Sequence, residues 1–420
     1  MFEIRTLENG VKVIADPNPN VRSVSLGVWV ASGTRQEPPE LNGASHYIEH
    51  MLFKGTDSAD AAALADHMDA LGGEVNAFTT KECTCFYGRV LDEKLREFTD
   101  LLADMLFHSR FDEGCVETER GVIIEEIGMC DDTPDDLAVE NLMLGVYRGT
   151  PLGYPILGTR ESLAPITGKC LKNYMAGHYV GGAVVISICG HFTVGDLDYI
   201  AETFARFPAG ERAPGGSSEY RPAMVCVEKQ TEQNHIVIGF PALSYLDEDR
   251  FALQILNNII GGNVSSRLFQ RIREQLGLCY SVSSFLTTHS DCGMLAIYIG
   301  TGAKSERKAI TEIGRELRRL LRDGIPEEEL YKVRDSIRSG LLMGLESTSA
   351  RMNYMGKGLL LQNCASDPDK AADRYLAVER DQIEALAQRL LREDGIAVSA
   401  VTRKGSAEKY AEWLREGFLG

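Results

Sequence analysis

Two histidines and a glutamate stand close together in the segment His46-Tyr47-Ile48-Glu49-His50. On a helix with about 3.6 residues per turn, positions 46 and 50 share one face and position 49 lies beside them. Two imidazoles in this arrangement can bind one zinc ion, and the carboxylate between them can reach a water molecule on the metal. The pattern predicts a hydrolytic zinc site; the plainer alternative is a surface helix with two unrelated histidines.

Such a site needs a third protein ligand and one position left open for water. The segment E-R-G-V-I-I-E-E supplies candidates in Glu119 and Glu126, which lie seven residues apart and so share a helix face. Glu126 follows His50 by 126 − 50 = 76 residues. The neighbouring Glu125 is rotated by about 100° on the same helix. The plainer alternative for Glu119 is a solvated carboxylate on an acidic helix.

The H-x-x-E-H order is that of the inverted zincins. The chain resembles the peptidase family of the mitochondrial processing peptidase, pitrilysin and insulin-degrading enzyme, and most of all its short two-domain bacterial members. Five stretches carry the resemblance along the chain: A-S-H-Y-I-E-H-M-L-F-K-G-T at 44–56, G-G-E-V-N-A-F-T-T-K-E at 72–82, the segment with Glu119 and Glu126, E-Q-N-H-I-V-I-G-F at 232–240, and S-S-R-L-F-Q-R-I-R-E-Q-L-G-L-C-Y at 265–280. Ser45 departs from the pattern, which favours a bulkier or apolar residue.

The resemblance implies a role for each matching residue. It implies one zinc ion per chain, with His46, His50 and Glu126 as ligands, Glu49 as the general base and Glu119 as a carboxylate of the second ligand shell. Asn76 and Ala77 are expected on an edge strand that pairs with the substrate backbone, and Phe78 either walls a side-chain pocket with Phe53 or belongs to the core. Arg273 and Tyr280 match a pair that contacts the substrate from a C-terminal domain.

Composition narrows the class of protein. The chain has 420 residues, a formal net charge of −17, 44% hydrophobic and 25% charged residues, which suits a globular protein of two domains. The acidic balance argues against a nucleic-acid partner, which needs a basic face. No apolar run is long enough to span a membrane, and the first residues resemble neither a signal peptide nor a presequence. With ten scattered cysteines, we expect reduced thiols and a cytoplasmic protein.

Turn-forming residues divide the chain. Pro208 to Pro222 includes A-P-G-G-S-S, which suits an exposed linker, so we predict an N-terminal zinc-binding domain at 1–210, a linker at 211–222 and a C-terminal domain at 223–420. A hairpin is predicted at 2–16 with Asn9-Gly10 in its turn, and a single strand at 74–90. Further elements are expected as strands at 23–30, 183–189, 234–240, 279–285 and 292–300, and as helices at 61–71, 93–107, 113–130, 136–147, 169–178, 194–206, 251–260 and 265–275.

The two halves open with the same coarse order of elements, which indicates two homologous domains. Each is expected to be α+β, with a mixed, mostly antiparallel sheet and helices packed on one face. The helix at 251–260 reads F-A-L-Q-I-L-N-N-I-I, so metal ligands are expected in the first domain only.

The resulting functional hypothesis is a zinc-dependent endopeptidase acting on peptides or unfolded and processing segments, with a water molecule activated by zinc and Glu49. The alternative is a peptide-binding scaffold or partner subunit of the same fold that cleaves little. Because long relatives close four such domains around a chamber, the resemblance also implies a homodimer. In that dimer the zinc site of one subunit would face Arg273 and Tyr280 of the other.

Overall fold

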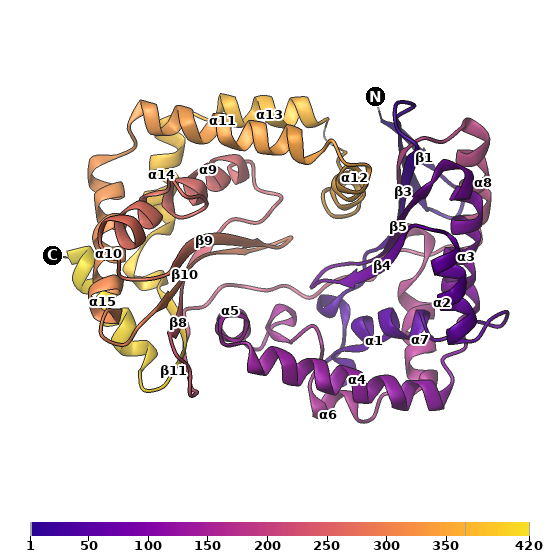
Figure 1. Cartoon of the computed structure of the whole chain (residues 1–420), viewed down its shortest axis with the longest axis horizontal. Coiled ribbons are helices and arrows are strands. Elements are labelled where there is room, and N and C mark those ends of the chain that lie inside the picture. Colours follow the sequence, from indigo (N-terminus) through magenta and orange to yellow (C-terminus); the bar gives the residue numbers. More distant parts are fainter. Residues whose placement is uncertain (1, 366, 420) are drawn as a thin grey trace. The chain divides into compact units, whose positions relative to one another are not determined.

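The computed structural model describes residues 2–365 and 367–419, and its contacts divide the chain into two compact units (Figure 1). Unit 1 comprises Met1–Ile127, Tyr154–Gly216 and Leu342–Pro368. Unit 2 comprises Gly128–Gly153, Ser217–Leu341 and Asp369–Gly420. Unit 1 therefore includes a segment from the second half of the sequence, and unit 2 includes one from the first half. The predicted linear boundaries, 1–210 and 223–420, do not include this exchange. The predicted linker, 211–222, has no helix or strand.

Unit 1 contains a six-stranded sheet in the order β1-β2-β6-β3-β5-β4. All neighbours are antiparallel except β2 and β6, which are parallel. The strands are β1 (Glu3–Thr6), β2 (Lys12–Pro17), β3 (Ser23–Val30), β4 (Glu74–Thr79), β5 (Thr84–Leu91) and β6 (Val184–Gly190). The helices are α1 (Ala44–Leu52), α2 (Ala61–Ala70), α3 (Leu95–His108), α4 (Glu113–Asp132, whose last turn lies in unit 2), α6 (Arg160–Leu163), α7 (Gly168–His178), α8 (Val194–Phe204) and α12 (Thr348–Gln362).

Unit 2 contains a five-stranded sheet in the order β7-β11-β8-β10-β9, again with a single parallel pair, β7 and β11. This order corresponds to β2-β6-β3-β5-β4 of unit 1, so the prediction of two α+β domains of one fold is confirmed. The strands are β7 (Met224–Glu228), β8 (Asn234–Ala242), β9 (Ser281–Thr288), β10 (Gly293–Thr301) and β11 (Ala397–Thr402). The helices are α5 (Pro134–Val146), α9 (Arg250–Ile260), α10 (Glu306–Asp323), α11 (Glu327–Gly344, which ends in unit 1), α13 (Pro368–Ala377), α14 (Arg380–Leu390) and α15 (Ala407–Leu419).

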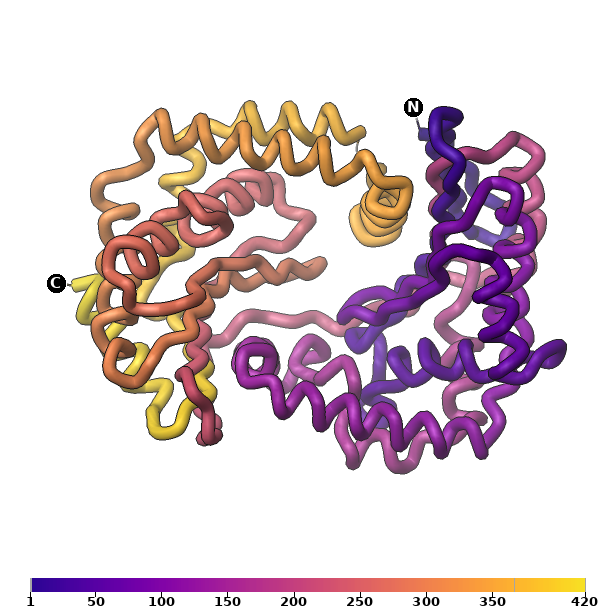
Figure 2. Tube along the Cα trace, in the orientation of Figure 1, coloured from indigo at the N-terminus to yellow at the C-terminus, as the bar shows by residue number. Residues whose placement is uncertain are grey.

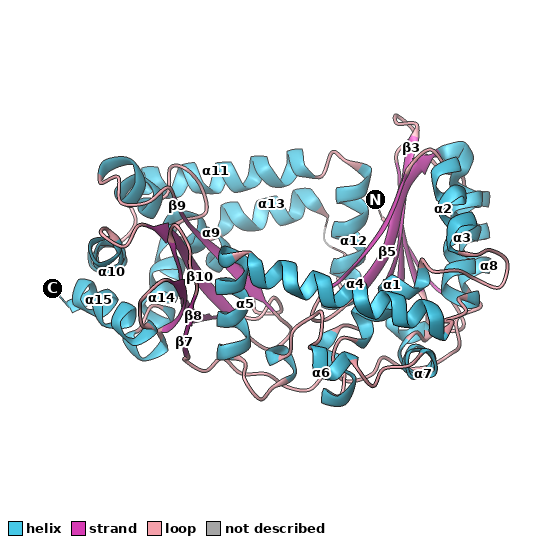
Figure 3. Cartoon of the chain, turned by 60° about the horizontal axis from the view of Figure 1, so that its bottom comes forward, coloured by secondary structure: helices cyan, strands magenta, loops and turns pink. Residues whose placement is uncertain are grey.

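Each sheet has helices on one face and a single helix from the other half of the sequence on the second face. In unit 1, α2, α3 and α8 lie on one side of the sheet and α12 lies on the other (Figure 3). Figure 2 shows α12 in the orange of the late sequence against the indigo strands. In unit 2, α5 covers β7, β8 and β11 in the same way. All seven residues of β6 are buried, as expected for a strand covered on both faces.

Small residues allow α12 to approach its sheet closely. A Cβ atom on Gly27 would lie 2.5 Å from Met352 Sδ, and one on Gly356 would lie 2.3 Å from Trp29 Nε1. Ser25 Oγ donates to Thr348 Oγ1 at 2.9 Å. Glycine at both contacts lets helix and sheet meet without a clash.

Several predicted elements agree with the structure, and one does not. The first hairpin forms with Gly10 at φ +96°, the left-handed conformation that glycine tolerates. The segment 74–90 is a hairpin of β4 and β5 rather than one strand. Its turn contains no glycine, proline or asparagine; Thr80 Oγ1 instead accepts from the backbone N–H of Cys83 at 3.1 Å, a turn type that sequence signals mark weakly.

Candidate functional site

Helix α1 carries both histidines of the predicted site. Its apolar residues Ile48, Met51 and Leu52 are buried in the core of unit 1. His46 and His50 lie one turn apart on another face, with their ring centres 4.6 Å from each other. The hydroxyl of Tyr47 donates to the backbone oxygen of Val116. That bond joins α1 to α4, the helix of Glu119 and Glu126.

The side chain of Glu126 completes a group of three possible metal ligands. Its Oε2 atom lies 3.7 Å from His46 Nε2 and 3.7 Å from His50 Nε2. All three ligand atoms lie within 4.8 Å of one another. In the part of the chain that the structure describes, no other group of three His, Cys, Asp or Glu side chains converges in this way.

The three ligand atoms suit a cation that they share. Glu126 Oε2 is buried and has no hydrogen-bond partner, which is costly for a carboxylate unless a cation compensates it. Burial, with a smaller contribution from His50, lowers the pKa of His46 to about 3, so this imidazole is neutral, as a metal ligand must be. Zinc bonds of about 2.0–2.1 Å in a tetrahedron hold ligand atoms somewhat over 3 Å apart, close to the 3.7 Å seen here.

Glu119 connects His50 to a lysine. Its Oε2 atom lies 3.1 Å from His50 Nδ1, and its Oε1 atom lies 2.9 Å from Lys54 Nζ. Glu119 is 4% exposed, so its charge has these two partners rather than bulk water. A carboxylate on the second nitrogen of a ligating histidine orients the ring and sets its tautomer.

Glu49 points to the sheet instead of joining the three ligand atoms. Its Oε2 atom accepts a hydrogen bond of 2.5 Å from Thr79 Oγ1 at the end of β4. Burial raises the pKa of Glu49, while the Thr79 hydrogen bond opposes that shift. His50 and Glu126 also act electrostatically on this carboxyl, the first lowering its pKa and the second raising it.

Strand β4, which carries Asn76, Ala77 and Phe78, is the last strand of its sheet. The backbone N–H of Thr80 donates to the backbone oxygen of Cys83 at 2.8 Å. In an antiparallel pair every second residue points its backbone N–H and C=O groups to the partner strand, so those of Asn76 and Phe78 face β5. The N–H and C=O groups of Ala77 point to the open edge, where the Asn76 side chain accepts from Ala77 N at 2.8 Å. Phe78 packs near Trp29 and Tyr87, whereas Phe53 contacts a different cluster, that of α1.

Arg273 and Tyr280 lie in unit 2, whereas the metal-ligand group lies in unit 1. The Arg273 guanidinium carbon lies 5.2 Å from the centre of the Tyr280 ring and 4.7 Å from that of Phe269. Tyr280 is 75% exposed. Part of the helix predicted at 265–275 is a π-helix, Phe269–Gln275, a conformation that is rare and common at functional sites.

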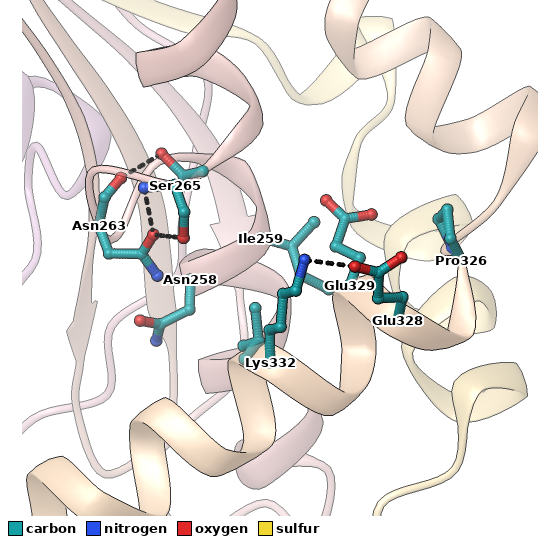
Figure 4. Close-up of a pocket in the computed structure, with 10 residues that line it drawn as sticks. Asn258, Ile259, Asn263, Ser265, Pro326, Glu328, Glu329 and Lys332 are labelled. Carbon is teal, nitrogen blue, oxygen red and sulfur yellow. Dashed lines mark hydrogen bonds and ion pairs between the residues drawn. The ribbon is translucent and has the colours of Figure 1, made fainter.

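Unit 2 also has a cavity of about 340 Å³ between α9, α11 and the loop that follows α9 (Figure 4). Its charged groups are paired: Lys332 Nζ lies 2.6 Å from Glu328, and Glu329 accepts from Arg267 at 2.5 and 2.9 Å. In the described part of the chain, no group of three His, Cys, Asp or Glu side chains converges at this cavity.

Sequence reasoning did not identify Thr79 and Lys54 as site residues, although both lie in the stretches that carry the resemblance. Only the fold brings Thr79 to Glu49 and Lys54 to Glu119. It also explains Ser45: this residue is fully buried, with its hydroxyl 3.4 Å from the Tyr174 hydroxyl, so a bulkier side chain would displace that neighbour.

None of the described helices is long and apolar enough to cross a membrane.

Comparison with known proteins places these features in a family. Residues 12–160 match the sequence profile described as "Insulinase (Peptidase family M16)", and residues 165–337 match "Peptidase M16 inactive domain". The chain is similar to the "Uncharacterized zinc protease YmxG" of Bacillus subtilis, with 41% identity over 97% of this chain and 99% of that protein. An "Uncharacterized zinc protease" of Streptomyces coelicolor is 34% identical over 92% of this chain and 86% of its own length.

Solved structures share the fold over nearly the whole chain. A protease from Helicobacter pylori has a TM-score of 0.89 at 19% identity and covers 96% of this chain and 99% of its own. A peptidase M16 inactive domain from Pseudomonas fluorescens has a TM-score of 0.88 at 21% identity, covering 96% and 98%. These two likenesses are evidence for the fold alone.

Proposed function

Because this chain belongs to peptidase family M16, we propose that it is a zinc-dependent endopeptidase acting on peptides or unfolded protein segments. The observation that carries the proposal is the convergence of His46 Nε2, His50 Nε2 and Glu126 Oε2, with the last atom buried and without a partner. The names of the similar bacterial proteins support zinc as the metal.

In this proposal His46, His50 and Glu126 hold one zinc ion, and Glu119 orients His50. The bound ion would supply a Lewis acid that lowers the pKa of a water molecule and polarises the carbonyl of the peptide bond. Two neutral imidazoles and one carboxylate leave a net charge of about +1 on such a site, which preserves that acidity.

Glu49 is the residue we propose as the general base. Its Oε2 atom is occupied by the Thr79 hydroxyl, so Oε1 is available to take a proton from the attacking water. The same oxygen can then deliver the proton to the leaving amine nitrogen. The bond to Thr79 fixes the carboxylate relative to β4.

The open edge of β4 is the proposed binding surface for the substrate backbone. A peptide that adds as another strand would exchange hydrogen bonds with the N–H and C=O groups of Ala77, after the Asn76 side chain moves off the Ala77 N–H. Binding of this kind uses main-chain groups and accepts many sequences. It joins the peptide to the strand whose Thr79 holds Glu49.

The test compares the wild type with Glu49→Gln, using a quenched fluorescent peptide and the zinc content of the purified proteins. We expect both to contain one zinc per chain, and the variant to be slower by about 10² to 10⁴ because an amide cannot accept the proton. Glu125→Gln is the matched control and should cleave normally. A Glu49→Gln variant with wild-type turnover would refute the role of Glu49, and a wild type that binds zinc but cleaves nothing would favour the scaffold alternative.

The homodimer belongs to the same proposal and has its own test. Light scattering at the assay concentration should give twice the chain mass. Mixing inactive Glu49→Gln with inactive Arg273→Ala should then restore partial activity if the zinc site of one subunit works with Arg273 of the other. A monomer with full activity would refute the dimer.

A further inference from the structure

Glu37 differs from every other buried carboxylate in the described residues. Six acidic residues are buried, namely Asp16, Glu37, Glu82, Glu119, Glu312 and Glu316. Five of them contact a cation: Asp16 contacts Arg351, Glu82 contacts Arg35, Glu119 contacts Lys54, Glu312 contacts Arg315 and Glu316 contacts Arg319. Glu37, which is 6% exposed, has no ion pair in the described part of the chain.

The partner of Glu37 is the first turn of α1. Its Oε1 atom accepts from the backbone N–H of Ser45 at 2.7 Å, and its Oε2 atom accepts from that of Gly43 at 2.8 Å. The Asn42 side chain donates to Oε2 at 3.1 Å. Burial raises the pKa of Glu37, and the two backbone N–H groups oppose that shift. The positive end of the helix therefore takes the place of a counterion.

The local sequence explains why Glu37, and not the residue next to the helix, accepts these hydrogen bonds. The residue that precedes α1 is Gly43, at φ +98°, and it has no side chain to cap the helix. A Cβ atom there would lie 2.9 Å from Leu163 and 3.0 Å from Gly158, so a capping serine or aspartate does not fit. Glu37 supplies the missing acceptor from the preceding loop, and it does so for two N–H groups at once.

The proposed ligand His46 follows directly after Ser45, and the backbone N–H of Ser45 donates to Glu37. We propose that Glu37 is a positioning residue for the metal-ligand helix: it fixes the first turn of α1 so that His46 Nε2 meets His50 Nε2 and Glu126 Oε2. The inference rests on the proposed function for the metal, and it adds a residue that contacts neither the ligands nor the substrate. A purely structural cap would lower stability alone, whereas a positioning residue also sets metal affinity.

The test is Glu37→Gln, with Glu40→Gln as the control. Glutamine has nearly the same shape, but its NH₂ group replaces one of the two acceptors and faces a backbone N–H. Glu40 lies in the same loop and is exposed. Zinc affinity is measured on the full chain by competition with a chromophoric chelator. Ligand geometry is measured by the visible absorption of the Co²⁺-substituted protein, and folding by circular dichroism.

We expect Glu37→Gln to fold and to bind zinc about 10- to 100-fold more weakly, the range for residues that orient metal ligands. Its Co²⁺ spectrum should change and the rise in melting temperature on adding zinc should shrink, whereas Glu40→Gln should match the wild type. If Glu37→Gln does not fold, Glu37→Asp is measured in its place, and weaker zinc binding is again expected because the shorter side chain cannot reach both N–H groups.

Two results would overturn the inference, and they differ. A wild type that binds zinc, with a folded Glu37→Gln (or Glu37→Asp) of equal zinc affinity and unchanged Co²⁺ spectrum, would reduce Glu37 to a structural cap. A wild type that binds no zinc would instead overturn the proposed function, and the role of Glu37 with it.

Discussion

The close approach of α12 to the sheet of unit 1 predicts that Gly356→Ala destabilises the protein. The new Cβ atom would lie 2.3 Å from Trp29 Nε1, so the helix or the indole ring must move by about 1 Å. Overpacking of this kind costs about 1–3 kcal/mol. Alanine recovers up to about 1 kcal/mol through its better helix propensity, which leaves a net loss of about 1–2 kcal/mol.

Thermal unfolding measures this loss. A change of 1 kcal/mol shifts the melting temperature of a domain of 150–250 residues by about 2–4 °C, so we expect a decrease of about 2–8 °C. Gly340→Ala is the matched control, because Gly340 lies in the interior of α11, is exposed, and has no atom within 4 Å of its Cβ position. That substitution should raise stability by up to about 1 kcal/mol.

A double-mutant cycle identifies the contact. Trp29 Nε1 is buried without a hydrogen-bond partner, and Trp29→Phe removes that atom together with part of the ring. The cost of Gly356→Ala should then be smaller in the Trp29→Phe background than in the wild type. Equal melting temperatures for wild type and Gly356→Ala, or a gain like that of Gly340→Ala, would show that α12 does not pack on Trp29 as described.

Three further substitutions test the site. Glu126→Gln should purify without zinc, because it replaces the one charged ligand by a neutral amide; one equivalent of zinc by mass spectrometry would move the ligand role to another carboxylate. Lys54→Met should weaken zinc binding about tenfold, because it removes the ion pair between Lys54 and Glu119 and leaves His50 as the only partner of that carboxylate. Lys54→Arg should keep most of the zinc affinity, measured by the same chelator competition. Ala77→Pro removes an N–H that points to the open edge of β4, where proline is tolerated, so KM for peptides should rise about tenfold with zinc content and melting temperature nearly unchanged. An unchanged KM would place the substrate elsewhere.

The histidine pair of the proposed metal site was predictable because its spacing is local, whereas Glu126 was predicted as a ligand from the family resemblance. His46 and His50 are neighbours on any helix that includes them, and Glu119 and Glu126 share a face for the same reason. The contacts of Glu37 were not predictable in this way. This residue reaches Gly43 and Ser45 across an irregular loop, and no periodic pattern relates residues six or eight positions apart in a loop.

The exchange of helices between the two halves was also beyond sequence reasoning. The apolar face of α12 shows that it packs on something, but periodicity does not tell which sheet it covers. Gly27 lies against Met352 and Gly356 lies against Trp29, so each contact joins positions more than 300 residues apart (352 − 27 = 325 and 356 − 29 = 327). The role of each glycine in packing becomes evident only once α12 is seen to lie on β3 and β6.

The two units differ in how their corresponding helices, α1 and α9, are held in place. Helix α9 of unit 2 follows its sheet strand β8 as α1 follows β3, and its buried residues are nearly all apolar, with no capping bond from Asp249 at its start. Apolar packing holds it on the sheet, together with a hydrogen bond of 2.9 Å from Ser284 Oγ of β9 to Asn257 O. Helix α1 also buries apolar residues, among them Ile48, Met51 and Leu52, and in addition carries two imidazoles on another face. The bonds of Glu37 to its first turn and of Tyr47 to Val116 add to this packing and fix the helix in the orientation that the proposed metal site needs.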